Sequence, residues 1–206
     1  MRKLFWQMNV TLDGLIEGPH HELDYTAQFP DPDFDRYASE MLQSIDGILL
    51  GRRTYELFAG YWPAATGPDA DRLNELPKTV FSRTLKSLQW NNSRLVSDDV
   101  VQEVRRLKGE SGKELALFGS ADLGSTLVRL GLIDEIRLLV SPVILGKGTP
   151  MFQEIGRSID LKLTHASTWS SGIVVLYYEL LPTGSSGIND HTMERTVAGH
   201  IGESAA

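Results

Sequence analysis

The chain has 206 residues, of which 41% are hydrophobic and 23% charged, with a net charge of −7 and no cysteine. This length and composition fit one globular domain with a full core and are marginal for two. The lack of cysteine excludes disulfides, thiolate metal sites and a cysteine nucleophile, and the negative charge argues against general binding to nucleic acid or anionic membranes.

The first half of the chain predicts strands that alternate with helices. An apolar run over residues 4–10 predicts a strand that leads into a turn, and residues 15–32, which are broken by Gly and Pro, predict a loop. Apolar residues spaced for one helical face then run over 34–45, with Asp31 placed as the N-cap. The all-apolar segment 47–51 is typical of a strand that is buried on both faces of a parallel sheet.

The second half continues this alternation and then changes to strands alone. In chain order it predicts strands at 79–82 and 94–96, a helix at 98–108, a strand at 114–118, a helix at 120–131, and β-rich runs at 135–145, 161–168 and 173–181. A turn at 170–172 would join the last two runs as an antiparallel hairpin. We therefore predict an α/β domain over residues 1–181, with a mainly parallel mixed sheet and helices on both faces. Residues 182–206 are expected to form a flexible or partner-contacting tail.

Three segments place small or cationic residues directly after a predicted strand. They are "LLGRRTYE" (49–56), "VFSRT" (80–84) and "LFGSADLGSTL" (117–127). Ligands of open α/β sheets bind beyond the carboxyl ends of the strands, and free N–H groups in the first turn of a helix favour phosphate. We expect Gly51 and Gly119 to admit the ligand, and Arg53 and Arg83 to contact it. Each segment alone also fits a plain turn with solvated arginines, and Arg53 is favoured over Arg52 as the phosphate ligand.

Other catalytic signatures are absent from the sequence. Ser125 stands where an ATP-binding loop needs its lysine, no G-x-G-x-x-G follows the first strand, and the histidines lack H-E-x-x-H spacing. No metal site is expected. Asp35 follows the apolar helix position Phe34 and is a candidate proton donor, with capping of the helix as the alternative.

Together these segments resemble the dihydrofolate reductase superfamily, and within it the branch of riboflavin-biosynthesis pyrimidine reductase domains. The resemblance covers about residues 1–181 and rests on "VTLDGLIEG", "DGILLGRRTYELFAGYWP", "TVFSRT", "LFGSADLGSTLVRLGLIDEI" and "SPVILGKGTPMF", in that order. It implies a dihydrofolate reductase-like three-layer fold with a mostly parallel, mixed eight-stranded sheet and a C-terminal antiparallel hairpin.

The resemblance also implies NADPH as the cofactor. The residues that it assigns to the cofactor are Asn9, Ile16, Gly51, Arg52, Arg53, Thr54, Ser82, Arg83, Thr84, Gly119, Ser120, Ala121, Asp122 and Leu123. Asn9 and Ile16 would border the nicotinamide, and residues 82–84 would face the adenosine 2′-phosphate. The other residues would surround the pyrophosphate.

The implied reaction is hydride transfer from NADPH to a pterin-like or 5-amino-6-(5-phosphoribosylamino)uracil-like substrate. Counting back from Gly51, Asp35 falls where folate reductases carry a carboxylate that binds the pteridine and assists its protonation. Phe58 and Trp62 are expected to line the substrate pocket, with core packing as the alternative. Leu117 stands where riboflavin-pathway reductases tend to carry an acidic residue. This departure favours a non-catalytic NADPH- or nucleotide-binding module as the alternative function.

The expected setting is the cytoplasm. Residues 1–9 lack the apolar core of a signal peptide, and no apolar stretch approaches about 18 residues. The expected partners are a small heterocyclic substrate and, because the resembling family often forms dimers, a second copy of the chain. Neither nucleic acid nor a membrane is expected as a partner.

Overall fold

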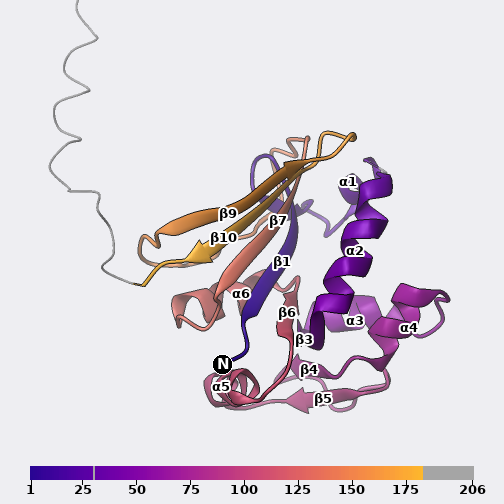
Figure 1. The fold of residues 1–206 in the computed structure, drawn as a ribbon, viewed down its shortest axis with the longest axis vertical. Helices are drawn as coiled ribbons and strands as arrows, with labels where there is room; N and C mark the ends of the chain where they lie inside the picture. Colours follow the sequence, from indigo (N-terminus) through magenta and orange to yellow (C-terminus); the bar gives the residue numbers. More distant parts are fainter. Residues whose placement is uncertain (30, 183–206) are drawn as a thin grey trace, which may run out of the picture.

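The structure, a computed structural model, describes residues 1–29 and 31–182 and is built on one eight-stranded sheet (Figure 1). The strand order is β5-β4-β3-β6-β1-β7-β10-β9. The strands are β1 (Leu4–Thr11), β3 (Ile45–Gly51), β4 (Lys78–Phe81), β5 (Ser93–Val96), β6 (Glu114–Phe118), β7 (Glu135–Ser141), β9 (Leu161–Thr168) and β10 (Val174–Leu180). In this order, each strand from β5 through β4, β3, β6 and β1 to β7 is parallel to its neighbour. Strand β10 is antiparallel to both β7 and β9. The predicted mixed, mainly parallel sheet with a closing hairpin is confirmed.

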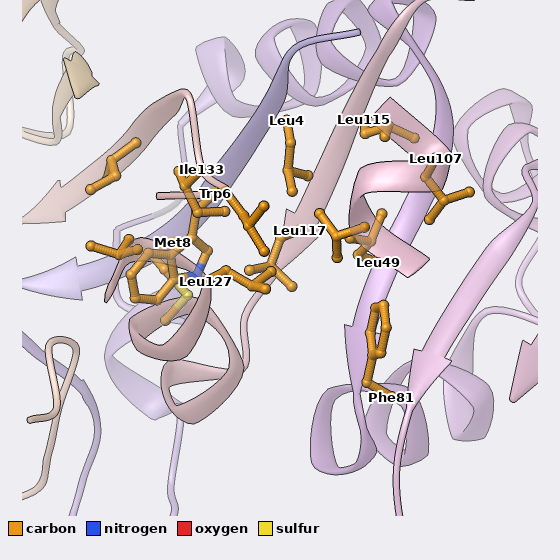
Figure 2. Packing of buried hydrophobic residues seen from close by; sticks show 14 of the residues in the cluster. Leu4, Trp6, Met8, Leu49, Phe81, Leu107, Leu115, Leu117, Leu127 and Ile133 are labelled. Carbon is orange, nitrogen blue, oxygen red and sulfur yellow. The ribbon is translucent and has the colours of Figure 1, made fainter. Parts of the chain in front are cut away.

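Helices cover both faces of this sheet. Alternate side chains of β1 point to opposite faces, so each face has apolar residues that a layer of helices buries. The helices are α1 (Asp24–Ala27), α2 (Pro32–Ser44), α3 (Arg52–Tyr61), α4 (Pro68–Glu75), α5 (Val100–Gly109) and α6 (Ala121–Arg129). Trp6 belongs to a buried cluster with Leu107 of α5 and Leu127 of α6, and Figure 2 shows this packing. Phe5 belongs to the cluster on the other face, with Leu42 of α2. The sheet is therefore the middle layer of three.

Helix α2 forms where the sequence predicts it, for local reasons. The Asp31 carboxylate accepts a hydrogen bond of 2.8 Å from the backbone N–H of Asp33, and Pro32 occupies the first helical position, where its missing N–H is not needed. One apolar face then packs on the sheet, with Leu42 fully buried. Helix α5 is capped in the same way by Asp99.

The predicted loop over residues 15–32 is wrong in part. It contains the strand β2 (Leu15–Glu17), which pairs with the two-residue strand β8 (Thr149–Pro150), and the single-turn helix α1. Both strands are too short to show an alternating pattern, and their pairing joins distant parts of the chain. Helix α4 was not predicted, although Pro68 follows Gly67 at its start and acidic residues fill its first turn.

The first of the three predicted β-rich runs, 135–145, is shorter in the structure than in the prediction. Strand β7 ends at Ser141, where Pro142 follows and cannot donate a ladder hydrogen bond. Except for Pro182, the predicted tail at 182–206 lies outside the described residues. Within 1–29 and 31–182, no helix combines the length and the apolar character needed to cross a membrane.

Candidate functional site

The carboxyl ends of three parallel strands lie side by side and open into one cavity. Gly51 at the end of β3 pairs with Phe81 of β4, and Leu50 pairs with Phe118 of β6. The cavity has a volume of about 810 Å³. Its lining includes Asn9, Ile16, Glu17, His21, Tyr25, Thr26, Gly51, Arg52, Arg53, Thr54, Glu56, Phe58, Gly119, Ser120, Ala121, Asp122, Leu123, Thr149 and Gln153. We call this space the first cavity.

A hydrogen-bonded contact joins the turns that follow β3 and β6. The hydroxyl of Ser120 accepts a hydrogen bond of 2.8 Å from the backbone N–H of Gly51 and lies 3.0 Å from Thr54 Oγ1. A Cβ atom on Gly51 would meet Ser120 Oγ at 2.4 Å, and one on Gly119 would meet Thr54 Oγ1 at 2.8 Å. Gly119 and Ser120 both have positive φ angles, of 57° and 54°. Glycine is therefore required at positions 51 and 119, and the two turns form one unit.

The same unit is attached to the core through Trp6. The indole N–H of Trp6 donates a hydrogen bond of 2.8 Å to the carbonyl oxygen of Gly119. A Cβ on Gly124 of α6 would lie 2.1 Å from the indole ring, so only glycine fits there. Trp6 itself is fully buried. The position of the 119–120 turn is thus set by the packing of β1 beneath it.

The helices that begin at this unit have free N-terminal groups. Among the described residues, no side chain caps α3 or α6, whereas Asp31 and Asp99 cap α2 and α5. The first N–H groups of a helix have no partner within the helix, and with the helix dipole they favour an anion. Two such helix ends border the first cavity, and this arrangement suits a pyrophosphate.

Both arginines of the "LLGRRTYE" segment line the first cavity, and both are paired with carboxylates. Arg52 lies 3.3 Å from the carboxylate of Glu56, one helical turn away, and both side chains are about half exposed. Arg53 makes two hydrogen bonds to Glu17 of β2, from Nη1 to Oε1 at 3.2 Å and from Nη2 to Oε2 at 3.0 Å. The two arginines therefore differ in the strength of their pairing.

Glu17 is a buried carboxylate at the wall of the first cavity. Its Oε1 atom also accepts hydrogen bonds of 2.7 Å from Thr149 Oγ1 and has His21 Nδ1 at 2.7 Å. Burial alone would raise the pKa of Glu17, but the contacts with Thr149 and His21 and the charge of Arg53 together lower it below the usual value. Glu17 therefore stays ionised and connects β2, β8 and α3.

Tyr25 supports the floor of the first cavity from α1. Its hydroxyl donates to the carbonyl oxygens of Asn9 and Ile16, at 2.9 and 3.1 Å, and its side chain is buried. Burial and the nearby charge of Glu17 raise the pKa of Tyr25, so the phenol keeps its proton. Asn9 and Ile16, the residues assigned to the nicotinamide, are thus fixed side by side.

A second cavity of about 610 Å³ adjoins the first. Its lining consists of Asn9, Thr26, Phe29, Asp31, Pro32, Phe34, Asp35, Leu139, Ser141 and Ile173. Asn9 and Thr26 line both cavities. The Asp31 carboxylate accepts hydrogen bonds from Asp33, Ser170 and Ser171, whereas the exposed side chain of Asp35 forms no hydrogen bond or ion pair within the described part of the chain.

A model of the RibD C-terminal domain family matches residues 2–175. The chain belongs to the RibD C-terminal domain family. It is 37% identical over 182 residues to the Bacillus subtilis (strain 168) protein named uncharacterized protein YyaP. The aligned region covers 86% of this chain and 94% of that protein. A second protein of the same organism, YwjB, is 28% identical over 178 residues, covering 85% and 97% of the two chains.

Solved structures agree on the RibD C-terminal domain fold. A protein of Shewanella sp. PV-4, provisionally named a riboflavin biosynthesis protein, superposes with a TM-score of 0.73 at 20% identity, covering 87% of this chain and 99% of that chain. A Thermotoga maritima deaminase and 5-amino-6-(5-phosphoribosylamino)uracil reductase gives a TM-score of 0.63 at 15% identity. The superposition covers 87% of this RibD C-terminal domain chain and 57% of the longer Thermotoga maritima chain.

The remaining residues assigned from the sequence are distributed unevenly in this RibD C-terminal domain. Phe58 lines the first cavity, but Trp62 lines neither cavity and packs 6.3 Å from the Phe58 ring in the core. Residues 82–84 directly follow the lining residue Phe81 in the chain but line neither cavity. Ser82 Oγ accepts hydrogen bonds from the backbone N–H groups of Thr84 and Leu85.

Leu117, which stands where an acidic residue was expected from the resemblance, does not belong to the wall of either cavity in this RibD C-terminal domain. Leu117 is fully buried in the cluster beneath α6 and lines neither cavity. Sequence reasoning also missed two residues that shape the site, Glu17 and Tyr25. Their partners lie 36 and 16 residues away in the chain, at Arg53 and Asn9, so no local motif indicated them.

Proposed function

We propose that this protein is an NADPH-dependent reductase that transfers hydride to a pterin-like or 5-amino-6-(5-phosphoribosylamino)uracil-like ring. The observation that carries the proposal is the meeting of two cavities at Asn9 and Thr26. The first cavity has the features of a dinucleotide site, and the second has room for a heterocycle. Membership of the RibD C-terminal domain family, and the reductase name of the Thermotoga maritima neighbour, support the same reaction class.

The cofactor fits the residues that line the first cavity. The uncapped starts of α3 and α6 would hold the pyrophosphate through the backbone of residues 52–54 and 121–123, with Gly51 and Gly119 allowing close approach. Arg83, on the adjoining strand end, would face the 2′-phosphate. NADPH, when bound, supplies the hydride, and the protein supplies orientation and electrostatics.

The second cavity supplies groups for the substrate. The side chain of Asp35 has no partner in the described part of the chain, so it can accept hydrogen bonds from the N–H groups of a ring or relay a proton. Reduction of a C=N bond would add a hydride to its carbon and a proton to its nitrogen, and Asp35 would relay that proton from solvent. Among the described lining residues the charged ones are carboxylates, Asp31 and Asp35, which favours the pterin-like substrate over the phosphorylated one.

The segment from β2 to α1 would cover the reacting atoms. Ile16 of β2 and Tyr25 of α1 line the first cavity, and Phe29, just after α1, lines the second. In this position it would exclude water from the nicotinamide end.

A binding and turnover experiment tests the proposal. NADPH and NADH are titrated by fluorescence, and cofactor oxidation is then followed by absorbance with a panel of pterins and aminopyrimidines. We expect preferential NADPH binding and oxidation with at least one pterin. No NADPH binding at millimolar concentration would refute the proposal, and binding without oxidation by any compound would favour a nucleotide-binding module instead.

The role of Asp35 has a matched control on the same helix. Asp35→Asn should lower kcat with a pterin by at least about tenfold, because a positioned proton donor contributes roughly 10²–10⁴-fold. Asp33→Asn removes the same charge from a residue that pairs with Arg36 and lines neither cavity. Its kinetics should stay close to those of the wild type, and equal losses in both variants would rule out a specific role for Asp35.

A further inference from the structure

Each arginine that lines the first cavity is already paired with a carboxylate that also lines it. Arg52 is paired with Glu56 and Arg53 with Glu17, and Asp122 adds a third carboxylate. An incoming phosphate therefore meets two arginines whose charges are largely compensated. Anion affinity depends on how readily these pairs separate.

The Arg53–Glu17 pair is the more strongly held of the two. Both terminal nitrogens of Arg53 donate to both carboxylate oxygens of Glu17, a bidentate arrangement that is stronger than a single contact. Glu17 is 9% exposed, so its charge is poorly screened by solvent. The Arg52–Glu56 contacts of 3.3 and 3.4 Å lie between exposed side chains and are of the kind that contribute little.

We propose that Glu17 is a specificity-determining residue that competes with phosphate-bearing ligands for Arg53 and thereby sets the affinity of the first cavity for them. This inference rests on the phosphate-binding part of the proposed function. When a phosphate binds, Arg53 turns from Glu17 towards it, and the segment 17–23 loses its connection to α3.

The surroundings of the pair allow this exchange. The Arg53 side chain is 53% exposed and lies at the cavity wall, so it can turn without leaving solvent or opening the core. Glu17 keeps two partners when Arg53 leaves, because Thr149 and His21 both contact its Oε1 atom. The carboxylate therefore keeps its hydrogen bonds at Oε1 and gives up the Arg53 contact at Oε2, which is the cost that a bound phosphate has to offset.

The backbone around Glu17 remains in place during the exchange. A Cβ on Gly148 would lie 2.0 Å from the carbonyl oxygen of Glu17, so β2 and β8 are in close contact at this point. Beyond Glu17 the segment is held by Gly18 N–H to the carbonyl oxygen of Glu22 and by His20 N–H to the Glu22 carboxylate. Loss of the Arg53 contact should loosen the part of the segment that follows Glu17 and leave β2 paired with β8.

A double-mutant cycle tests the competition directly. Dissociation constants for NADPH and inorganic pyrophosphate are measured for the wild type, Glu17→Gln, Arg53→Met and the double variant. Glu17→Gln should tighten both ligands about tenfold, because it releases Arg53 from its carboxylate partner and leaves the guanidinium to contact the phosphate. In the Arg53→Met background the same substitution should change the constants less than about twofold.

A control and a second measurement complete the test. Glu40→Gln removes a charge from an exposed position on α2 that lines neither cavity, and it should leave both constants unchanged. Hydrogen exchange of the wild-type protein needs no variant to fold, and saturating pyrophosphate should make the amides of residues 17–23 exchange faster.

The outcomes separate this inference from the proposed function. If the wild type binds neither ligand, both proposals fail. If it binds NADPH but Glu17→Gln binds the same or more weakly, or gains equally without Arg53, the competition by Glu17 is overturned and the reductase proposal stands. Slower or unchanged exchange at residues 17–23 on adding pyrophosphate would also overturn it.

Discussion

The hydroxyl of Ser120 occupies the space where a side chain on Gly51 would lie, although the two residues are 69 positions apart. Gly51→Ala should therefore lower the free energy of unfolding by about 1–3 kcal/mol, as forced insertion of a methyl group into packed surroundings does. In a Ser120→Gly background the same substitution should cost distinctly less, because the opposing atom is gone. Urea unfolding of the four proteins measures this difference, and equal costs in both backgrounds would show that the contact is not limiting.

Arg83 should decide between NADPH and NADH. It is exposed two residues after the lining residue Phe81, and a charge-assisted contact with a 2′-phosphate contributes about 1.5–3 kcal/mol. Arg83→Ser should weaken NADPH at least about tenfold and leave NADH nearly unchanged. The exposed Arg105 of α5 provides the control, since Arg105→Ser removes the same charge from a residue that lines neither cavity. Equal loss for both cofactors would contradict the assignment.

Asp31 should make stability depend on acid pH. Burial alone would raise the pKa of Asp31, but hydrogen bonds from the backbone N–H groups of Asp33 and Ser171 and from the hydroxyl of Ser170 lower it from 3.8 to about 2. Because the native pKa lies below the unfolded one, the unfolded chain takes up this proton first as the pH falls. The stabilisation by Asp31 is therefore complete above about pH 4 and is lost progressively towards pH 2.

The dependence is measured by urea unfolding between these pH values. Asp31→Asn should lower stability near neutral pH and make the decline at acid pH shallower than in the wild type. Asp33→Asn, which removes one charge from the same helical turn, controls for net charge. An equally steep decline in Asp31→Asn would show that other carboxylates dominate.

We propose that the protein forms a homodimer through β9, the strand at one edge of the sheet. This edge strand exposes 40% of Leu161 and 50% of Leu163, and an exposed apolar edge is a ready site for pairing. Leu163→Lys should convert the dimer to a monomer in light scattering, whereas Tyr61→Lys, at a residue 64% exposed on α3, should not. A wild-type monomer at micromolar concentration would refute the proposal.

The sequence predicted the elements whose stability is local or periodic. Helix α2 has both a cap at Asp31 and an apolar face, and the β9–β10 hairpin has long β-rich runs around a short turn, so both were correctly placed. The strand β2 was missed because its pairing with β8 involves few residues from a distant part of the chain. Elements that depend on such partners carry little signal of their own.

The same distinction applies to the candidate site. Three strand ends were correctly expected to be neighbours, because parallel pairing brings carboxyl ends to one edge of a sheet. The partner of Arg53 was not predictable, since Glu17 reaches it only after β2 has paired with β8. The roles of Arg53 and Asp35 towards ligands stay predictions.

The indole of Trp6 couples the packing of the core to the position of the 119–120 turn, which matters for protein engineering. Because its N–H holds the Gly119 carbonyl oxygen and its ring leaves no room beside Gly124, any repacking of β1 beneath α6 would displace the 119–120 turn. Variants with substitutions in β1 beneath α6 that are selected only for heat resistance should lose affinity for the proposed ligand, NADPH, although no cavity residue has changed. The buried indole is also a built-in fluorescent reporter, whose emission should respond when the turn above it is occupied.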